Sequence, residues 1–329
     1  MPAPDHRSVL VVTSFDVEEI LPDVAVGPVR FPRRQAGGSP QGLAVTLLAD
    51  YSLRSRAWLP SAAIVALLAE SGATDGGART AISRLARRGV IESSRRGRHT
   101  FYRLTGPATT ALALGGRGVV GFAAAAESWD GCWSLIAFSM PQEGESERRS
   151  LRSRLRWLGY VPLYDGLWVS PRGLSAKVEA LGDLSLGTMT VFRAHRLDVD
   201  GMASRDPLDA WDLAGIGEHY DAFVRRWSRL LPRVRSGDLT GTEALRARTE
   251  VMDEYRTFVV LDPRLPMRLM PAGWLRGRAR ELFVAVYDGL AEPALRHVLR
   301  TVARFVDGPQ PDIGAHTVAE LLDGLVPAS

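Results

Sequence analysis

The chain has 329 residues, of which 46% are hydrophobic and 24% are charged, a balance typical of a globular protein with a substantial core. This composition excludes a collagen-like chain, a disulfide scaffold and a wholly disordered polypeptide. The formal net charge is +4 at pH 7, with 41 basic and 37 acidic side chains.

At roughly 100–150 residues per domain, the length predicts two or three domains. No apolar run approaches the ~20 residues that span a bilayer, and residues 9–12 are too few for the apolar part of a secretory signal. The single cysteine, Cys132, cannot form an internal disulfide, which suits a reducing compartment. We therefore expect a cytoplasmic protein without a membrane partner.

Most of the excess basic charge lies in one segment. Residues 79–103 contain eight arginines and one acidic residue, Glu92, so the rest of the chain is net acidic. Because Lys177 is the only lysine, the chain favours arginine throughout, and the position of the arginines is more informative than their number. A local basic face is typical of a protein that binds a polyanion such as nucleic acid.

Residues 39–106 are predicted to form three short helices followed by a two-stranded hairpin. Ser39 before Pro40 is typical of a helix N-cap and first turn. Thr74 is expected to cap the third helix, which ends at Gly89. Two short strands separated by a glycine turn follow. This order of elements is typical of a winged helix-turn-helix, a DNA-binding domain.

The third helix has two distinct faces. Its apolar residues recur at helical spacing and are Ala78, Ala81, Ile82, Leu85 and Ala86. Arginines and short hydroxyl side chains lie between them, and such groups read base edges and phosphates in a major groove. The candidate DNA-binding residues on this helix and the hairpin are Arg79, Thr80, Ser83, Arg84, Arg87, Arg95, Arg96, Arg98, His99 and Tyr102. The alternative is a solvated arginine face, but the adjoining basic hairpin favours DNA binding.

Residues 107–128 are expected to form a linker helix that breaks around residues 115–121. The sequence GRGVVG at 116–121 matches the GxGxxG fingerprint of dinucleotide-binding domains. Only residues 122–128 remain for the helix that this fingerprint requires, whereas a crossover between parallel strands needs about a dozen residues. We therefore interpret this segment as a linker rather than a nucleotide site.

Residues 129–200 are predicted to form a β-α-β-β-α-β domain of the ferredoxin-like type. The expected strands lie at 132–141, on both sides of Asp165-Gly166 and at 188–197; the expected helices lie at 145–158 and 175–181. Such a domain can act as a nuclease when a carboxylate ends its first strand. Here that strand ends in Ser139-Met140-Pro141, so this carboxylate is missing.

Residues 208–326 are predicted to form a helical C-terminal domain. The expected helices lie at 213–231, 243–261, 276–290 and 294–306, with prolines 263, 266, 271 and 293 between them. Rings and hydrogen-bond donors occur together in this region, as an aromatic or acyl ligand requires. The candidate effector-binding residues are Trp211, His219, Tyr220, Tyr255, Arg256 and Trp274. The alternative is that these rings pack a helical core.

The chain contains no HExxH spacing, cysteine pair, GxSxG sequence or phosphate-binding glycine loop. We therefore expect no metal site, no cofactor and no catalytic residues. The main alternative of another class is an enzyme, either a nuclease or an enzyme that processes CoA thioesters. A further alternative is a module that binds nucleic acid without sequence preference.

Several segments resemble the PaaX family of transcriptional repressors, which govern phenylacetic acid and related aromatic catabolism. They are VTLLADYSL at 45–53, ARTAISRLARRGVIESSRRGRHTFYRLT at 78–105, WDGCWSLIAFSMP at 129–141, RSRLRWLGYVPLYDGLWVSP at 152–171 and YRTFVVLDPRLPMRLMPAGW at 255–274. The N-terminal arm, residues 1–38, is outside this resemblance.

The resemblance implies a multidomain α+β protein with an N-terminal winged helix-turn-helix, a Cas2-like ferredoxin-like middle domain and a helical C-terminal domain. It also implies a homodimer on palindromic double-stranded operator DNA, released by an aryl-CoA thioester such as phenylacetyl-CoA. Carried over by position, Arg79, Thr80, Ser83 and Arg84 would be the recognition residues, and residues 95–102 the wing.

Overall fold

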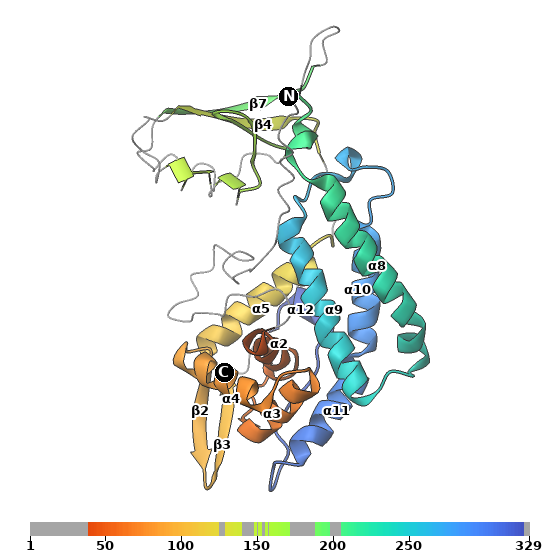
Figure 1. Cartoon of the computed structure of the whole chain (residues 1–329). Coiled ribbons are helices and arrows are strands. Elements are labelled where there is room, and N and C mark those ends of the chain that lie inside the picture. The colour runs from red at the N-terminus through yellow and green to blue at the C-terminus, as the bar shows by residue number, and fades with distance from the viewer. Residues whose placement is uncertain are drawn as a thin grey trace, which may run out of the picture. The chain divides into compact units, whose positions relative to one another are not determined.

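The computed structural model describes residues 39–124, 129–139, 148–149, 151–152, 155–156, 158–171, 188–197 and 205–325 (Figure 1). The chain divides into two compact units. Unit 1 comprises Met1–Ala124, Phe223–Val260 and Arg278–Ser329, and unit 2 comprises Ala125–Ala222 and Leu261–Gly277. The C-terminal helices therefore contribute residues to both units.

The N-terminal part of unit 1 contains the expected helices and hairpin, together with one short strand that the sequence did not predict. In chain order these elements are α2 (Pro40–Ser52), β1 (Leu59–Pro60), α3 (Ser61–Glu70), α4 (Asp75–Arg87), β2 (Ile91–Arg96) and β3 (His99–Leu104). The strands form an antiparallel sheet in the order β1-β3-β2. The predicted caps are confirmed, because Ser39 Oγ accepts from the Gly42 amide and Thr74 Oγ1 from the Gly77 amide, both at 3.1 Å.

Helix α5 (Gly106–Gly121) corrects the expected break at residues 115–121, because the helix runs through all of them. Gly116 allows close packing, because a Cβ there would lie only 3.2 Å from Leu321. The GxGxxG sequence is therefore the second half of a helix, where it contacts α12 (Val318–Asp323).

The C-terminal region is helical, as predicted, with small differences at the helix ends. It contains α8 (Leu213–Ser236), α9 (Gly241–Leu261), α10 (Arg276–Gly289) and α11 (Ala291–Ala303). Helix α8 continues five residues beyond its expected end, through Pro232. Pro293 lies in the first turn of α11 rather than before it, a position where the missing amide hydrogen is not needed.

A buried polar cluster joins α2 to the C-terminal helices within unit 1. The Tyr287 hydroxyl on α10 donates to Asp50 Oδ1 at 2.7 Å and lies 3.0 Å from His316 Nε2. Arg248 on α9 donates to the Tyr287 carbonyl and, at 2.6 Å, to the His316 carbonyl. All four side chains are buried. Helix α2 is therefore fixed to the C-terminal helices by buried hydrogen bonds.

Unit 2 contains an antiparallel sheet in the order β5-β6-β4-β7, which is the strand order of a ferredoxin-like sheet. The strands are β4 (Trp133–Ser139), β5 (Val161–Tyr164), β6 (Leu167–Ser170) and β7 (Thr188–Ala194). They lie where the sequence predicted them. The described residues between 148 and 156 are helical, whereas the helix expected at 175–181 lies outside the described residues.

Apolar residues cover both faces of this sheet. On one face Ile136 and Trp168 pack with Leu151 and Leu155, which lie within the helix expected at 145–158. On the other face a cluster around Trp133, Leu163 and Val169 includes Trp211 and Leu269 from later in the chain.

Candidate nucleic-acid interface

Helix α4 separates its two faces as the sequence predicted. Ala78, Ala81, Ile82 and Leu85 are buried, and Ala86 is half-buried. The opposite face is exposed and consists of Arg79, Thr80, Ser83, Arg84 and Arg87. Its apolar stripe packs on α2 and α3, so the polar face points away from the core.

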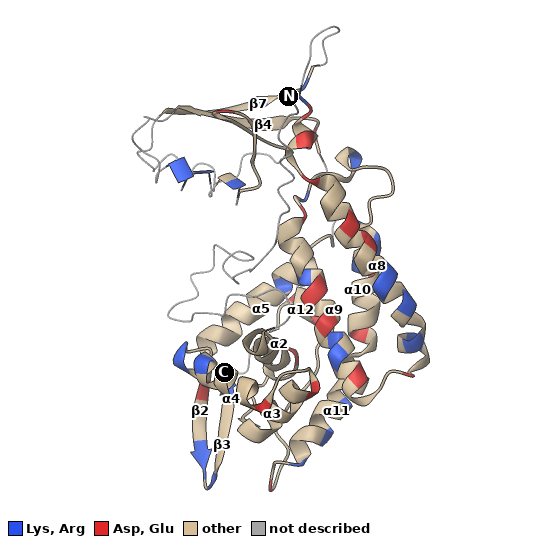
Figure 2. Cartoon of the chain, in the orientation of Figure 1, with Lys and Arg blue, Asp and Glu red and all other residues tan. Residues whose placement is uncertain are grey.

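The hairpin after α4 has a basic tip (Figure 2). Arg96 pairs directly with His99 across the two strands, and Gly97 between them has a φ of 58°, as the first position of a two-residue turn requires. Four of the predicted hairpin residues, Arg95, Arg96, Arg98 and His99, are exposed, whereas Tyr102 is half-buried.

The arginines of this region differ in how much of their charge is available. Near the base of the hairpin Glu92 accepts from Arg103 Nε at 2.7 Å and from Arg56 Nη2 at 3.2 Å. Among the residues that the structure describes, no carboxylate pairs with Arg79, Arg84, Arg87, Arg95 or Arg98. The unneutralised charge therefore lies on α4 and at the hairpin tip.

The six candidate effector-binding residues do not fall in one unit. Trp211, His219, Tyr220 and Trp274 belong to unit 2, and Tyr255 and Arg256 belong to unit 1.

Both tyrosines have structural partners. The hydroxyl of the fully buried Tyr220 donates to Asp262 at 2.7 Å. That of the equally buried Tyr255 donates to the Phe122 carbonyl at 3.0 Å.

The other four candidates vary in exposure. Trp211 stacks on Trp133 with ring centroids 6.4 Å apart, and Trp274 meets the Tyr220 ring edge-on at 5.5 Å. Arg256 forms an ion pair with Asp253, and His219 is exposed. The rings thus contribute to packing within each unit, and their role toward a ligand stays a prediction.

Sequence reasoning missed the buried ion pair that organises the segment after α9. Arg276 donates through Nη2 to Asp262 Oδ1 at 2.7 Å and through Nε to Oδ2 at 2.9 Å. Asp262 also accepts from Tyr220, so three residues from distant positions form one network. Because the partners are 14 and 42 residues apart, no local sequence pattern could have indicated this network.

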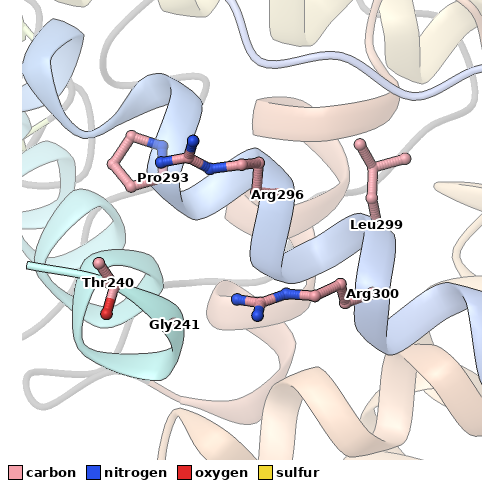
Figure 3. Close-up of a pocket in the computed structure, with 6 residues that line it drawn as sticks. All are labelled: Thr240, Gly241, Pro293, Arg296, Leu299 and Arg300. Carbon is pink, nitrogen blue, oxygen red and sulfur yellow. The ribbon is translucent and has the colours of Figure 1, made fainter.

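A shallow groove lies in unit 1 beside the start of α9 (Figure 3). It is lined by Thr240, Gly241, Pro293, Arg296, Leu299 and Arg300, and none of the candidate effector-binding residues is among them. Arg296 is already paired with Glu292 at 2.9 Å.

Within the described ranges, no three His, Cys, Asp or Glu side chains gather as a metal ion would require. The helices in these ranges also include none with the length and apolarity needed to cross a membrane. Strand β4 ends at Ser139, so its last residue supplies no carboxylate for metal-dependent hydrolysis.

Three family models match successive parts of the chain. The PaaX-like protein model matches residues 39–108, the PaaX protein central Cas2-like domain matches residues 126–205, and the PaaX-like protein C-terminal domain matches residues 211–300. The chain belongs to the PaaX family. The resemblance of the separate segments to that family is therefore confirmed.

The chain is also similar to two individual proteins. The transcriptional repressor PaaX of Escherichia coli (strain K12) is 29% identical over 250 residues, which are 73% of this chain and 76% of the relative. The solved structure of the uncharacterized protein Rv0674 from Mycobacterium tuberculosis is 20% identical with a TM-score of 0.47, over 80% of this chain and 95% of that one.

Proposed function

We propose that this protein is a transcriptional repressor that binds double-stranded operator DNA as a homodimer through a winged helix-turn-helix at residues 39–106. The observation that carries the proposal is the pairing of α4 with the hairpin: an exposed face of arginines and hydroxyls is followed directly by an arginine-rich tip. The repressor activity of the E. coli relative supports it.

The two elements would have different roles on DNA. Arg79 and Arg84 project from a helix of the length that fits a major groove, where an arginine can donate two hydrogen bonds to one guanine. Thr80 and Ser83 lie on the same exposed face and can bond to base edges or phosphates. The hairpin tip would contact phosphates, which position the protein but carry no sequence information.

The experiment that tests the proposal is titration of the full-length protein with a duplex selected from a random-sequence pool and with an unrelated duplex, both in EDTA. We expect tighter binding to the selected duplex and no cleavage of either. A module without sequence preference would bind both equally, with a steep dependence on salt, and a nuclease would cut DNA when a divalent metal is restored. Either result would contradict the proposal.

Replacing Arg95 or Arg98 by alanine is expected to weaken binding to both duplexes by the same factor. Each lost phosphate contact should also reduce the slope of log K against log salt by about one unit. The matched control is Arg235→Ala, which removes an exposed arginine at the end of α8 and should leave the slope unchanged. Loss of binding to the selected duplex alone would show that the tip reads bases.

The proposed effector is an aryl-CoA thioester that binds outside residues 39–106 and releases the DNA of genes for aromatic catabolism. Such a ligand joins a polyanionic nucleotide to an aromatic acyl group, so it needs arginines and rings. Unit 1 contains Arg256 and the buried ring of Tyr255, and unit 2 contains the half-buried rings of Trp211 and Trp274 and the exposed His219.

Calorimetry with phenylacetyl-CoA and with free phenylacetic acid, each with and without the selected duplex, tests the effector. We expect the thioester to bind, and the duplex to weaken its binding by the same factor by which the thioester weakens DNA binding, because the coupling between two sites is reciprocal. Binding of the free acid alone, or of neither compound, would contradict the thioester.

A further inference from the structure

We propose that Trp58 is a positioning residue for DNA binding: its ring holds Arg96 and Arg103 along one face of the hairpin and leaves Arg95 and Arg98 as the phosphate-binding side chains. This inference rests on the proposed function, because it concerns how the hairpin meets DNA. It divides the basic tip into arginines that brace the hairpin and arginines that contact the ligand.

The strand register places these residues on two faces. Residues that pair across an antiparallel sheet share a face, and alternate residues of one strand share it too. Arg95 pairs with Thr100, on the face that carries the buried Leu59, Ile91 and Leu104. We call the opposite face the outer face; it carries Glu92, Ser94, Arg96, His99, Phe101 and Arg103.

Trp58 joins the outer face from the third strand. In β1, Leu59 pairs with Tyr102 and Pro60 with Phe101. Continuing this register by one residue sets Trp58 opposite Arg103. The indole therefore lies on the outer face, beside the side chains of β3.

The distances show a continuous stack on this face. The Arg103 guanidinium carbon lies 4.5 Å from the centre of the Trp58 ring, and that of Arg96 lies 5.9 Å from it. Arg96 also lies 5.1 Å from the centre of the Phe101 ring. All three distances are within the ~6 Å over which a cation and an aromatic face attract each other. Glu92 holds Arg103 from its other side.

The hairpin needs such a stack because its outer part has only two strands. Strand β1 pairs with Tyr102 and Phe101 and ends there, so β2 and β3 extend beyond it toward the tip alone. A two-stranded hairpin is marginally stable in water without further packing. Side chains that bridge Trp58 at the base to Arg96 near the tip supply that packing.

The same geometry indicates which arginines of the hairpin remain available to bind phosphates. Arg103 is held by Glu92 and Trp58, and Arg96 lies along two rings. Arg95 is on the other face and Arg98 is in the turn, and both are exposed without a ring or carboxylate partner among the described residues. Their guanidinium groups can turn toward phosphates without leaving a stacking partner.

The first test uses Trp58→Leu and the conservative Trp58→Phe in the full-length protein. We expect Trp58→Leu to weaken binding to the selected and the unrelated duplex alike, by about three- to tenfold, the range of a partly exposed cation–π contact. The salt slope should stay unchanged, because no phosphate contact is lost. Trp58→Phe keeps an aromatic face and should restore most of the affinity.

Hydrogen exchange provides a readout that does not depend on DNA. In Trp58→Leu the amides of residues 94–100 should exchange faster, while those of α4 keep their protection and show that the domain is folded. Normal exchange in the hairpin together with normal DNA affinity would overturn the proposal.

The second test compares the arginines. Arg96→Ala should weaken binding to both duplexes, as Trp58→Leu does, and the loss in the double variant should be smaller than the two single losses combined, because both substitutions remove the contact between Trp58 and Arg96. Arg95→Ala and Arg98→Ala should each lower the salt slope by about one unit. A lower slope in Arg96→Ala would overturn the division of roles. Unchanged DNA binding in Arg95→Ala and Arg98→Ala would overturn their assignment as the phosphate-binding side chains. Failure of the wild-type protein to prefer the selected duplex would instead contradict the proposed function, and faster hairpin exchange in Trp58→Leu would then still show that Trp58 stabilises the hairpin.

Discussion

Replacing Arg248 by methionine is expected to lower the free energy of unfolding by several kcal/mol, because each buried polar group left without its partner costs about 1–3 kcal/mol. Arg248 is fully buried, donates to two backbone carbonyls and lies 3.7 Å from the centre of the Tyr287 ring. Its loss leaves those carbonyls without a donor and removes a positive charge that favours the ionised form of the buried Asp50. Urea unfolding of the full-length protein measures the effect.

The matched control is Arg233→Met on α8. Arg233 donates through two nitrogens to Glu243 at 2.6 and 2.8 Å, but both side chains are about half exposed. An exposed pair contributes at most about 1 kcal/mol, so this variant should unfold almost as the wild type does. Equal effects of the two substitutions would contradict a specific role for the buried cluster.

The destabilisation by Arg248→Met should also depend on pH. Burial raises the pKa of Asp50 in the wild type, and the Arg248 guanidinium opposes that rise, so the pKa rises further in the variant. A carboxyl with a raised pKa in the folded state stabilises the protein below its unfolded pKa of about 3.9, and this stability is lost as the pH rises through the folded pKa. Burial and Arg248 also lower the pKa of His316 to about 3, so without Arg248 this ring accepts a proton more readily in acid. Both changes predict that Arg248→Met lowers the free energy of unfolding less at pH 5 than at pH 8.

The double substitution Arg79→Ala, Arg84→Ala is expected to abolish preference for the selected duplex while leaving the fold intact. Both side chains are exposed on α4, so their removal disturbs no packing. An arginine bonded to a guanine through two hydrogen bonds contributes about 1–3 kcal/mol of discrimination, which is about 5- to 150-fold in affinity for each residue. Titration of each single variant against duplexes altered at one base pair would show which base loses its preference.

The control for this loss is the double substitution Arg225→Ala, Arg229→Ala. These two arginines are also exposed on a helix, α8, and their removal changes the net charge by the same amount. We expect specific binding to persist in the control. If specific binding falls as much in the control as in the α4 variant, the loss reflects overall charge and not the position of the arginines. If neither substitution on α4 changes specific binding, the assignment of this helix to DNA recognition is wrong.

Much of the DNA-binding surface could be predicted from the sequence because it depends on local interactions. The cap at Thr74, the apolar spacing of Ala78, Ile82 and Leu85 and the glycine turn at residue 97 act within a few residues of one another. Such contacts follow from helix and turn geometry. The four strands of unit 2 were also predictable, since three are short, mainly apolar runs near turn residues and β7 consists mainly of β-branched and apolar residues.

Other features depend on the tertiary structure, because they involve residues that are far apart in the chain. Helix α5 continues through residues 115–121, where α12, about 200 residues later, packs against it and leaves little room for a Cβ at Gly116. Sequence composition cannot show which arginine has its charge neutralised by a carboxylate. In the folded chain Glu92 forms an ion pair with Arg103, while Arg95 stays exposed. The hydrogen-bond acceptors of the buried Tyr220 and Tyr255 hydroxyls likewise come from distant positions in the chain, which only folding brings close. Local sequence determines which residues are available on a face, but long-range packing determines which of them remain free to bind, because desolvation and ion pairing depend on neighbours that only the folded chain brings together.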